Sequence, residues 1–352
     1  MFKQASHYLG FLKCLVRSRI KNRSVPLIVI LCVTNKCNLK CWYCYGEHCK
    51  RLDWLDFTKK DLLGIITKLY NLGTKVLQFQ GGEPLLRNDL EDIIKKAKSF
   101  NMIVDMVTNG TLISERRNVI SLLDKICVSL DGPKKLNDKN RGEGNFNKVV
   151  EGINIANSLG LSVRISAVLT SDTSFNDIDW LLNFASRGNM LVNFSPSFDF
   201  VSQVTGSSFK PHDIADSYLK NLFNYIAMHK NTGSAVQFSA LSYKIASQWP
   251  VSYSKRTIKS DDMLGTYTYP HCYHGKYIFF IDSDGSLYPC CNFWGKAEYN
   301  IMRDGLESSI QSLSKRGCQA CYIPAYLDRN LFFKGNLNVW WNYFKQVIRG
   351  NI

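Results

Sequence analysis

Short apolar segments alternate with amphipathic segments through the first two thirds of this 352-residue chain, and this alternation constrains the fold more than any other feature. The apolar segments have the length of buried strands, and the amphipathic segments repeat apolar residues at helical spacing. Such alternation predicts a parallel α/β sheet, and six units predict a partial (β/α)6 barrel with its site at the carboxyl ends of the strands. The strands are expected at Leu27–Val33, Val76–Phe79, Ile103–Val107, Ile126–Leu130, Val163–Leu169 and Leu191–Phe194, and the helices at Lys59–Leu72, Asp89–Phe100, Leu112–Leu123, Phe146–Leu159, Asn176–Arg187 and Ile214–His229.

The composition indicates a globular protein in a reducing compartment. Hydrophobic residues make up 45% and charged residues 21%, which excludes a disordered chain. A chain of this size does not need disulfides, so its twelve cysteines, several of them closely spaced, favour metal ligation. We find no secretory signal, and residues 27–33 are too few to span a bilayer. We therefore expect a cytoplasmic protein.

Cys37, Cys41 and Cys44 form a C-x3-C-x2-C run in the loop after the first expected strand. Three thiolates at this spacing can hold three corners of a four-iron, four-sulfur cluster, whereas a fully protein-ligated cluster needs four. The remaining iron would be open, as metal positions that carry out chemistry are. The alternative is a zinc knuckle that recruits His48 or Cys49 as a further ligand.

A second motif, Gly81-Gly82-Glu83-Pro84, directly follows the second expected strand. Two glycines at a strand end allow the backbone to approach a ligand closely. By itself the motif indicates only a turn. Its place one β–α unit after the cysteine loop gives it more meaning.

Together the two motifs resemble those of the radical S-adenosylmethionine (SAM) superfamily over roughly residues 25–200. The resemblance implies a partial (β/α)6 barrel in which Cys37, Cys41 and Cys44 ligate the cluster. It also implies that SAM chelates the open iron, that the glycine loop contacts the methionine amino group and that Tyr43 lies near the adenine. Reductive cleavage of SAM would give a 5′-deoxyadenosyl radical that abstracts hydrogen from a substrate, with a flavodoxin- or ferredoxin-like electron donor. The implied cofactor-binding residues of these motifs are Tyr43, Gly81, Gly82, Glu83 and Pro84.

Two further strand ends fit this family. Asn109 follows the third expected strand and Ser129 ends the fourth, where they would contact the ribose or the carboxylate of SAM. The alternative is that both are loop residues that cap the next helix. No catalytic residue beyond these ligands is identified, although Asp105 and Cys127 are among the candidate hydrogen or proton donors.

The C-terminal part carries a second group of cysteines, Cys272, Cys290, Cys318 and Cys321, which can hold a zinc ion or an auxiliary iron–sulfur cluster. Segments 277–281 and 286–288 flank an Asp-Ser-Asp-Gly turn and predict a β-hairpin. The arrangement resembles the SPASM and twitch domains of radical SAM enzymes, and a single auxiliary 4Fe–4S cluster of the twitch type is the better match. The spacing to Gly285 favours Cys290 over Cys291 as the ligand.

A cluster with four protein ligands has no open iron, which favours a role in electron transfer; a purely structural cluster or zinc site is the alternative. The other cysteines, Cys14, Cys32, Cys49 and Cys127, are interpreted as small apolar residues.

The net charge of +15 is concentrated at the two ends, which contain no acidic residue. This distribution does not suit a nucleic-acid groove. Both ends have apolar residues at helical spacing, which is typical of helices that lie in a membrane interface or pack on the barrel. The apolar stripes are Ala5, Tyr8, Leu9, Leu12, Leu15, Val16 and Ile20, and then Leu337, Trp340, Trp341, Phe344 and Ile348, beside the basic residues Lys3, Lys13, Arg17, Arg19, Lys21, Arg23, Arg329, Lys334, Lys345 and Arg349.

The expected organisation is a basic amphipathic helix at 1–24, the radical SAM barrel at 25–230, a linker at 231–265, an auxiliary-cluster domain at 266–328 and a basic aromatic helix at 329–352. The amphipathic ends favour a lipid-type or lipid-linked substrate and peripheral membrane association. A maturase of a ribosomally made peptide, an enzyme acting on a small molecule such as a sugar or aminocyclitol, and a non-catalytic zinc or electron-transfer protein are the alternatives. The reaction outcome stays open.

Overall fold

The structure is a computed structural model that describes residues 2–51, 54–197, 200–201, 208–209, 214–259, 262, 267–313, 318–348 and 350. Among these residues, the side chains of 2–9, 21, 49, 200, 201, 208 and 209 lie outside the description.

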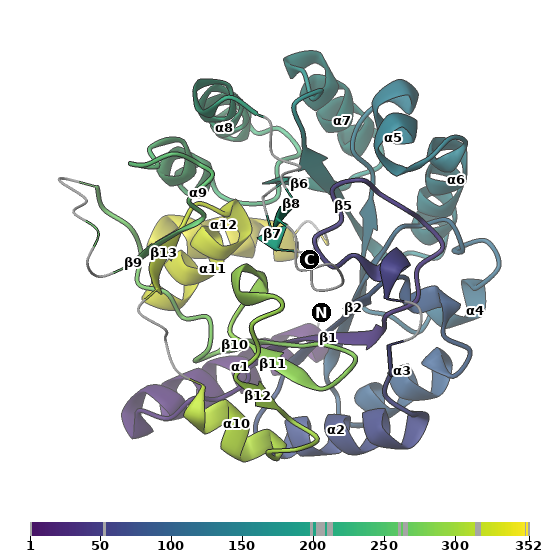
Figure 1. Cartoon of the computed structure of the whole chain (residues 1–352), viewed down its shortest axis with the longest axis vertical. Coiled ribbons are helices and arrows are strands. Elements are labelled where there is room, and N and C mark those ends of the chain that lie inside the picture. The colour runs from purple at the N-terminus through teal and green to yellow at the C-terminus, as the bar shows by residue number, and fades with distance from the viewer. Residues whose placement is uncertain are drawn as a thin grey trace.

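Six parallel strands form a curved sheet that is ringed by helices (Figure 1). The order β1-β2-β3-β4-β5-β6 follows the sequence, as expected for successive right-handed β–α units. Residues that face the helices, such as Leu77, Val104 and Ile126, are fully buried and apolar, while alternate residues face the barrel interior. The partial (β/α)6 barrel is confirmed. The strands are β1 (Ile28–Thr34), β2 (Val76–Gly81), β3 (Ile103–Thr108), β4 (Lys125–Ser129), β5 (Ser162–Leu169) and β6 (Leu191–Pro196).

The barrel helices begin where the sequence places caps. Thr58 and Ser174 each form a capping box with an aspartate three residues on, which starts α2 and α7. The helix expected at 112–123 is shorter in the structure, where only Arg117–Ile120 is regular helix. The chain before it forms turns, and the Thr111 amide there donates to the Asn109 side chain. The helices are α2 (Lys59–Asn71), α3 (Leu90–Ser99), α4 (Arg117–Ile120), α5 (Lys134–Arg141), α6 (Asn145–Ser158), α7 (Phe175–Arg187) and α8 (Asp216–Asn231), with short turns η1 (His48–Lys50) and η2 (Pro84–Leu86).

The predicted C-terminal hairpin is present and continues the barrel sheet. Strand β10 (Ile278–Ile281) pairs in parallel with β1, and β11 (Ser286–Tyr288) pairs antiparallel with β10. Strand β12 (Tyr299–Asn300) extends the same edge. The C-terminal unit is therefore hydrogen-bonded to the first strand of the barrel, next to the cysteine loop. The domain boundaries themselves stay a prediction.

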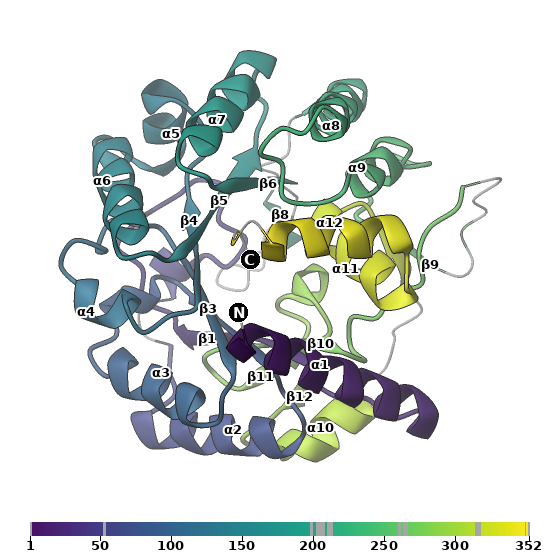
Figure 2. The ribbon, with the colours of Figure 1, turned by 180° about the vertical axis from the view of Figure 1, so that it is seen from behind.

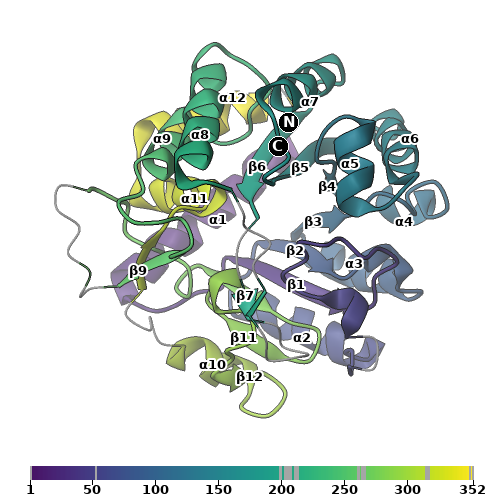
Figure 3. The same ribbon diagram turned by 45° about the horizontal axis from the view of Figure 1, so that its top comes forward.

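Most of the remaining elements lie across from the parallel strands and close the ring of helices around the barrel (Figures 1 and 3). Strand β13 (Cys318–Cys321) pairs with β9 (Thr257–Lys259), which lies in the stretch expected to be a linker, and β7 (Phe200–Val201) pairs with β8 (Ser208–Phe209). The helices are α9 (Ala240–Ser247), α10 (Leu306–Ser312), η3 (Cys291–Phe293), α11 (Pro324–Lys334), α12 (Leu337–Ile348) and the N-terminal α1 (Phe2–Lys21). Within the described parts, no helix is both long and apolar enough to cross a membrane.

Candidate active site and auxiliary cysteine site

Cys37, Cys41 and Cys44 lie in the loop that leaves the carboxyl end of β1. The Cys44 amide donates to the Cys41 carbonyl at 3.2 Å, which closes a turn between these two residues. Burial raises the pKa of Cys37 to about 12 and that of Cys41 to about 11, and the nearby thiols contribute to both shifts. The three half-buried thiols thus lie near one another, as cluster ligation requires.

The glycine turn after β2 holds the start of this loop. The Gly82 amide donates to the Thr34 carbonyl at 2.9 Å, and the Glu83 amide donates to the Lys36 carbonyl at 2.7 Å. A Cβ at Gly82 would lie 2.1 Å from the Lys36 carbonyl oxygen, and Gly81 has φ +139°. Both positions therefore require glycine because the chain itself passes so close. Pro84 begins η2.

Glu83 is a buried carboxylate that joins three segments. Its oxygens accept hydrogen bonds from the Thr108 hydroxyl at 2.7 Å, the Asn109 amide at 2.7 Å and the Leu85 amide at 3.0 Å. Burial raises its pKa to about 7, although these donors lower it. Glu83 thus fixes the ends of β2 and β3 relative to each other.

We expect Glu83→Gln to lower the free energy of unfolding by about 2–3 kcal/mol. The substitution replaces one acceptor oxygen by an NH2 group, which would face one of the buried donors that Glu83 binds. Chemical denaturation measures this change. Glu91→Gln is the matched control, since Glu91 pairs with Lys95 on the surface and should change stability by less than about 0.5 kcal/mol. Equal effects of the two substitutions would contradict this role.

Asn109 and Ser129 also lie at strand carboxyl ends. The Asn109 side-chain amide donates to Asn38 of the cysteine loop at 2.8 Å, and its oxygen accepts from Thr111. Asn38 in turn donates to Thr111 at 2.9 Å. Ser129, half-buried, ends β4 opposite Ser166. Asn109 therefore tethers the cysteine loop, and its predicted SAM contact stays a prediction, as does that of Ser129.

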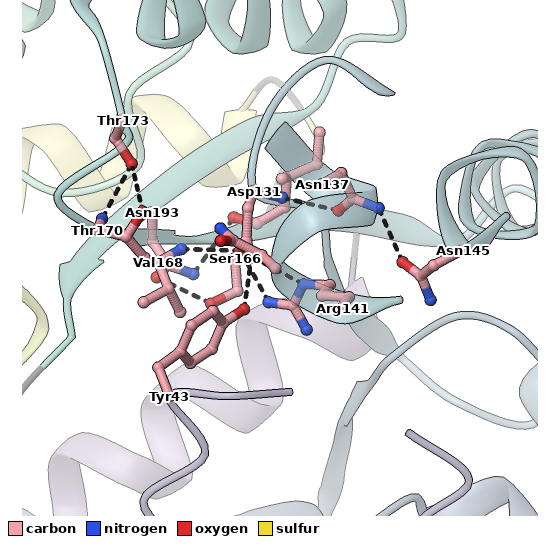
Figure 4. A network of polar contacts seen from close by, with 12 residues as sticks. Tyr43, Asp131, Asn137, Arg141, Asn145, Ser166, Val168, Thr170, Thr173 and Asn193 are labelled. Atoms are coloured by element: carbon pink, nitrogen blue, oxygen red, sulfur yellow. Dashed lines mark hydrogen bonds and ion pairs between the residues drawn. The ribbon is translucent and has the colours of Figure 1, made fainter. Parts of the chain in front are cut away.

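Tyr43 is held by a buried carboxylate that sequence reasoning did not single out (Figure 4). Its hydroxyl donates to Asp131 at 2.5 Å. Asp131 also accepts from Arg141 Nη2 at 2.8 Å, Asn140 at 3.2 Å and the Val168 amide at 3.0 Å. The only signal in the sequence was the place of Asp131 in Ser-Leu-Asp-Gly, two residues after the end of β4.

Several polar side chains point into the barrel interior and contact one another. Asp105 accepts from Gln78 at 2.6 Å and from Arg164 at 2.5 Å, and both the aspartate and the arginine are buried. Asn193 approaches the Cys127 sulfur at 3.7 Å, and burial raises the pKa of this thiol to about 11. The sequence pointed to Asp105 and Cys127 only as two of several candidate donors. The structure brings them together beside Arg164.

The four C-terminal cysteines converge from distant parts of the chain. Cys272 is among the groups that raise the pKa of Cys290, Cys318 and Cys321, as neighbouring thiols do. Cys318 and Cys321 are the ends of β13, whose pairing with β9 places them. Cys291 also contributes to the raised pKa of Cys290 and Cys321, so it lies beside the same group.

The Cys291 sulfur accepts a hydrogen bond from the Tyr326 hydroxyl at 3.0 Å. The Tyr326 ring lies 4.2 Å from that of His274. Tyr45, the residue after Cys44, packs into the same apolar cluster as Cys290, Cys291 and Tyr326. Tyr45 therefore connects the end of the three-cysteine loop to the C-terminal cysteine group.

A buried ion pair links the same two regions. Arg51 Nη2 lies 2.8 Å from Asp282 Oδ2, and neither side chain is more than 1% exposed. Arg51 also donates to the Gly46 carbonyl, and its guanidinium lies 4.0 Å from the centre of the Trp54 ring. His48 packs against Trp294, and burial lowers its pKa to about 3. The Cys49 side chain lies outside the described residues.

In the part of the chain that the structure describes, no three histidine, cysteine, aspartate or glutamate side chains are arranged around a single metal ion. The donor sets themselves fit iron–sulfur clusters, because each consists of buried or half-buried thiols that lie near one another. Cys37, Cys41 and Cys44 would hold one cluster, and Cys272, Cys290, Cys318 and Cys321 the other.

Residues 31–185 match the family model described as the radical SAM superfamily. A parallel partial barrel with the three-cysteine loop and the glycine turn at its carboxyl end is the fold and site of that class. The chain therefore carries a radical SAM domain over residues 31–185, and domains of this superfamily use a 4Fe–4S cluster and SAM.

Relatives extend the comparison to both parts of the chain. It is 32% identical over 200 residues to the probable GTP 3′,8-cyclase of Methanocella arvoryzae, covering 52% of this chain and 63% of that protein. It is 28% identical over 302 residues to the cysteine-type anaerobic sulfatase-maturating enzyme of Clostridium novyi, covering 76% and 74%. The chain spans only 63%, 55% and 48% of the length of three such curated relatives, all probable GTP 3′,8-cyclases.

Among solved structures, the chain resembles Streptococcus suis SuiB bound to S-adenosylmethionine. The TM-score is 0.61 at 18% identity, covering 84% of this chain and 66% of SuiB. SuiB bound to precursor peptide SuiA gives a TM-score of 0.60 at 19% identity, covering 84% and 67%. These likenesses show the fold.

Proposed function

We propose that this chain is a radical SAM enzyme that abstracts a hydrogen atom from its substrate. The observation that carries the proposal is the anchoring of the three-cysteine loop to the glycine turn by two backbone hydrogen bonds, within a radical SAM domain. Such anchoring fixes the thiols relative to the strand ends where SAM would lie. A non-catalytic zinc or electron-transfer protein would not need this turn.

The residues of the site have separable roles in this proposal. Cys37, Cys41 and Cys44 would ligate the cluster, and the cluster with bound SAM would supply the 5′-deoxyadenosyl radical. Gly81–Pro84, Asn109 and Ser129 bind SAM, and Tyr43 places its backbone near the adenine. Asp131 and Glu83 position these segments through their hydrogen bonds.

The barrel interior favours a substrate whose reacting part is polar. Asp105, Arg164, Cys127 and Asn193 lie on strands β3 to β6, beneath the strand ends that carry the cofactor residues. Buried charged groups of this kind are satisfied by polar partners. We therefore place the reacting group of the substrate above Cys127 and Arg164.

Two substrate classes are supported by different observations. A lipid-type or lipid-linked substrate is supported by the exposed amphipathic helices at both ends, which would keep the enzyme at a membrane. A peptide or protein substrate is supported by the match to a sulfatase-maturating enzyme and by the fold shared with SuiB. Incubation with each class and detection of 5′-deoxyadenosine formed above the substrate-free level would distinguish them.

We propose that the C-terminal unit holds an auxiliary 4Fe–4S cluster used for electron transfer. Support comes from the position of Tyr45, which follows Cys44 in the chain and packs with Cys290 and Cys291. Tyr45, Cys291 and Tyr326 would lie between the two clusters, and a flavodoxin- or ferredoxin-like protein would be the donor. A reducing, cytoplasmic compartment suits both clusters.

We expect Cys290→Ala to remove the auxiliary cluster, about half of the iron, because Cys290 is gathered with Cys272 and Cys321. Cys291→Ala should retain that iron, because the Cys291 sulfur is held by Tyr326. Iron and sulfide analysis of the anaerobically reconstituted variants measures both. The reverse result would assign Cys291 as the ligand.

The experiment that tests the function is anaerobic reconstitution followed by iron counting and electron-spin resonance with and without SAM. We expect about eight irons, and one reduced signal that shifts with SAM. The Cys37→Ala/Cys41→Ala/Cys44→Ala variant should lose that signal and about four irons. A wild-type protein without iron, or without a response to SAM, would refute the proposed function.

A further inference from the structure

Helix α12 presents an apolar stripe that no other described part of the chain covers. Leu337, Trp341, Phe344 and Ile348 recur at helical spacing and are 77%, 56%, 51% and 69% exposed. The Trp341 and Phe344 rings stack at 5.4 Å. The opposite side of the helix is held in place by the Gln346 side chain, which donates to the Gln237 carbonyl at 2.6 Å. Large exposed aromatic residues in this number indicate an interaction surface.

Helix α1 has two apolar stripes, and only one is used for packing. Leu15 is buried, and the Phe11 ring lies 6.1 Å from that of Phe333 on α11. The second stripe, Leu12, Val16 and Ile20, is 43%, 53% and 79% exposed. The side chains of Ala5, Tyr8 and Leu9, which were expected in the apolar stripe, lie outside the described residues.

The two helices lie on one face of the molecule (Figure 2). Helix α11 joins them, since Phe332 lies 6.3 Å from Phe11 of α1 and its carbonyl accepts from Trp340 Nε1 of α12 at 2.8 Å. Helix α1 leads into the amino end of β1, and Gln237 beneath α12 pairs with the start of β6. This face is therefore at the amino ends of the strands, and the cysteine loop is at the carboxyl ends.

The charged residues of the two terminal segments have one sign. Residues 1–24 and 329–352 contain no acidic residue. Lys13, Arg17, Lys334 and Lys345 are exposed beside the apolar stripes, and the Lys345 ammonium lies 5.4 Å from the centre of the Trp341 ring. Arg329, by contrast, is half-buried and belongs to the interior, where it acts on the pKa of Cys127.

We propose that the exposed stripes of α1 and α12 form one docking surface for an anionic lipid membrane. Aromatic and aliphatic side chains that enter the interface, flanked by lysine and arginine that meet lipid phosphates, are what interfacial helices use. A second copy of the chain is a poorer occupant, because a two-fold contact through this face would oppose like charges. The surface does not depend on the proposed chemistry, and it leaves the cysteine end of the barrel directed away from the lipid.

The test is co-sedimentation of the full-length protein with vesicles of phosphatidylcholine alone or mixed with phosphatidylglycerol. We expect strong binding only to the anionic vesicles, weakened by high salt. Lys13→Gln/Arg17→Gln/Lys345→Gln should weaken binding about a hundredfold, since each basic residue contributes about fivefold. Trp341→Ala/Phe344→Ala/Ile348→Ala should weaken it at least about tenfold.

Matched controls carry the same substitutions on exposed residues of other faces. Lys60→Gln/Lys148→Gln/Lys220→Gln and Leu55→Ala/Leu86→Ala/Met302→Ala, at the carboxyl ends of the strands, should bind as the wild type does. Denaturation curves of all variants exclude unfolding as the cause. Equal binding to both vesicle types, or equal loss in controls and test variants, would overturn the proposal. So would a dimer in solution that the Trp341 variant dissociates.

Discussion

Replacing Arg51 by methionine is expected to lower the free energy of unfolding by about 3–5 kcal/mol. The substitution leaves Asp282 as an uncompensated charge at a place where neither side chain is more than 1% exposed. Chemical denaturation under anaerobic conditions measures the change. Because Arg51 follows the cysteine loop and Asp282 lies in the C-terminal hairpin, the variant should also loosen the contact between the two cysteine groups.

Two controls separate this effect from a general one. Arg51→Met/Asp282→Leu removes both charges and should recover most of the loss. Lys59→Met removes an exposed partner of Asp92 and should cost less than about 0.5 kcal/mol. A double variant as unstable as Arg51→Met would show that the ion pair is not the cause.

The loss should also depend on pH with a defined sign. Burial raises the pKa of Asp282 to about 6 while Arg51 opposes this shift, so removing Arg51 raises the pKa further. A carboxyl whose folded pKa exceeds its unfolded pKa binds more protons when folded, and its stabilisation is lost as pH rises through the folded value. The deficit of Arg51→Met should therefore grow between about pH 5 and pH 8.

Asp131→Ala is expected to have the second large effect, a loss of about 3–5 kcal/mol. It leaves the Arg141 guanidinium buried without its carboxylate and removes the bonds to Tyr43, Asn140 and the Val168 amide. Since Tyr43 precedes Cys44, the cysteine loop should also retain less iron after reconstitution. Denaturation and iron analysis measure the two consequences.

Tyr43→Phe is the graded control for this group. It removes one hydrogen bond from Asp131 and leaves the Arg141 pair intact, so the expected cost is about 1–2 kcal/mol with iron retained. If Tyr43→Phe and Asp131→Ala lost similar amounts of stability, the Tyr43 hydrogen bond would account for the effect, and not the ion pair with Arg141. An unchanged Asp131→Ala protein would refute the role of the carboxylate.

The sequence by itself determined the six barrel strands to within two residues at each end, because buried parallel strands are read from short apolar runs between helical periods. It also placed Cys37, Cys41 and Cys44 near one another, because residues three or four positions apart remain close in any loop. The hairpin followed from its turn residues. The exposure of the α12 stripe was not determined, since the same periodicity suits a packed helix and a membrane-facing one.

Only the tertiary structure decided how the parts meet. The parallel pairing of β10 with β1, the placing of β13 by β9, and the Arg51–Asp282 pair across 231 positions have no local signal. The same holds for Asp131 beneath Tyr43 and for Arg164 beside Asp105. Propensity and period act between neighbours in the chain, whereas a buried charge finds its partner only after collapse has excluded water from both.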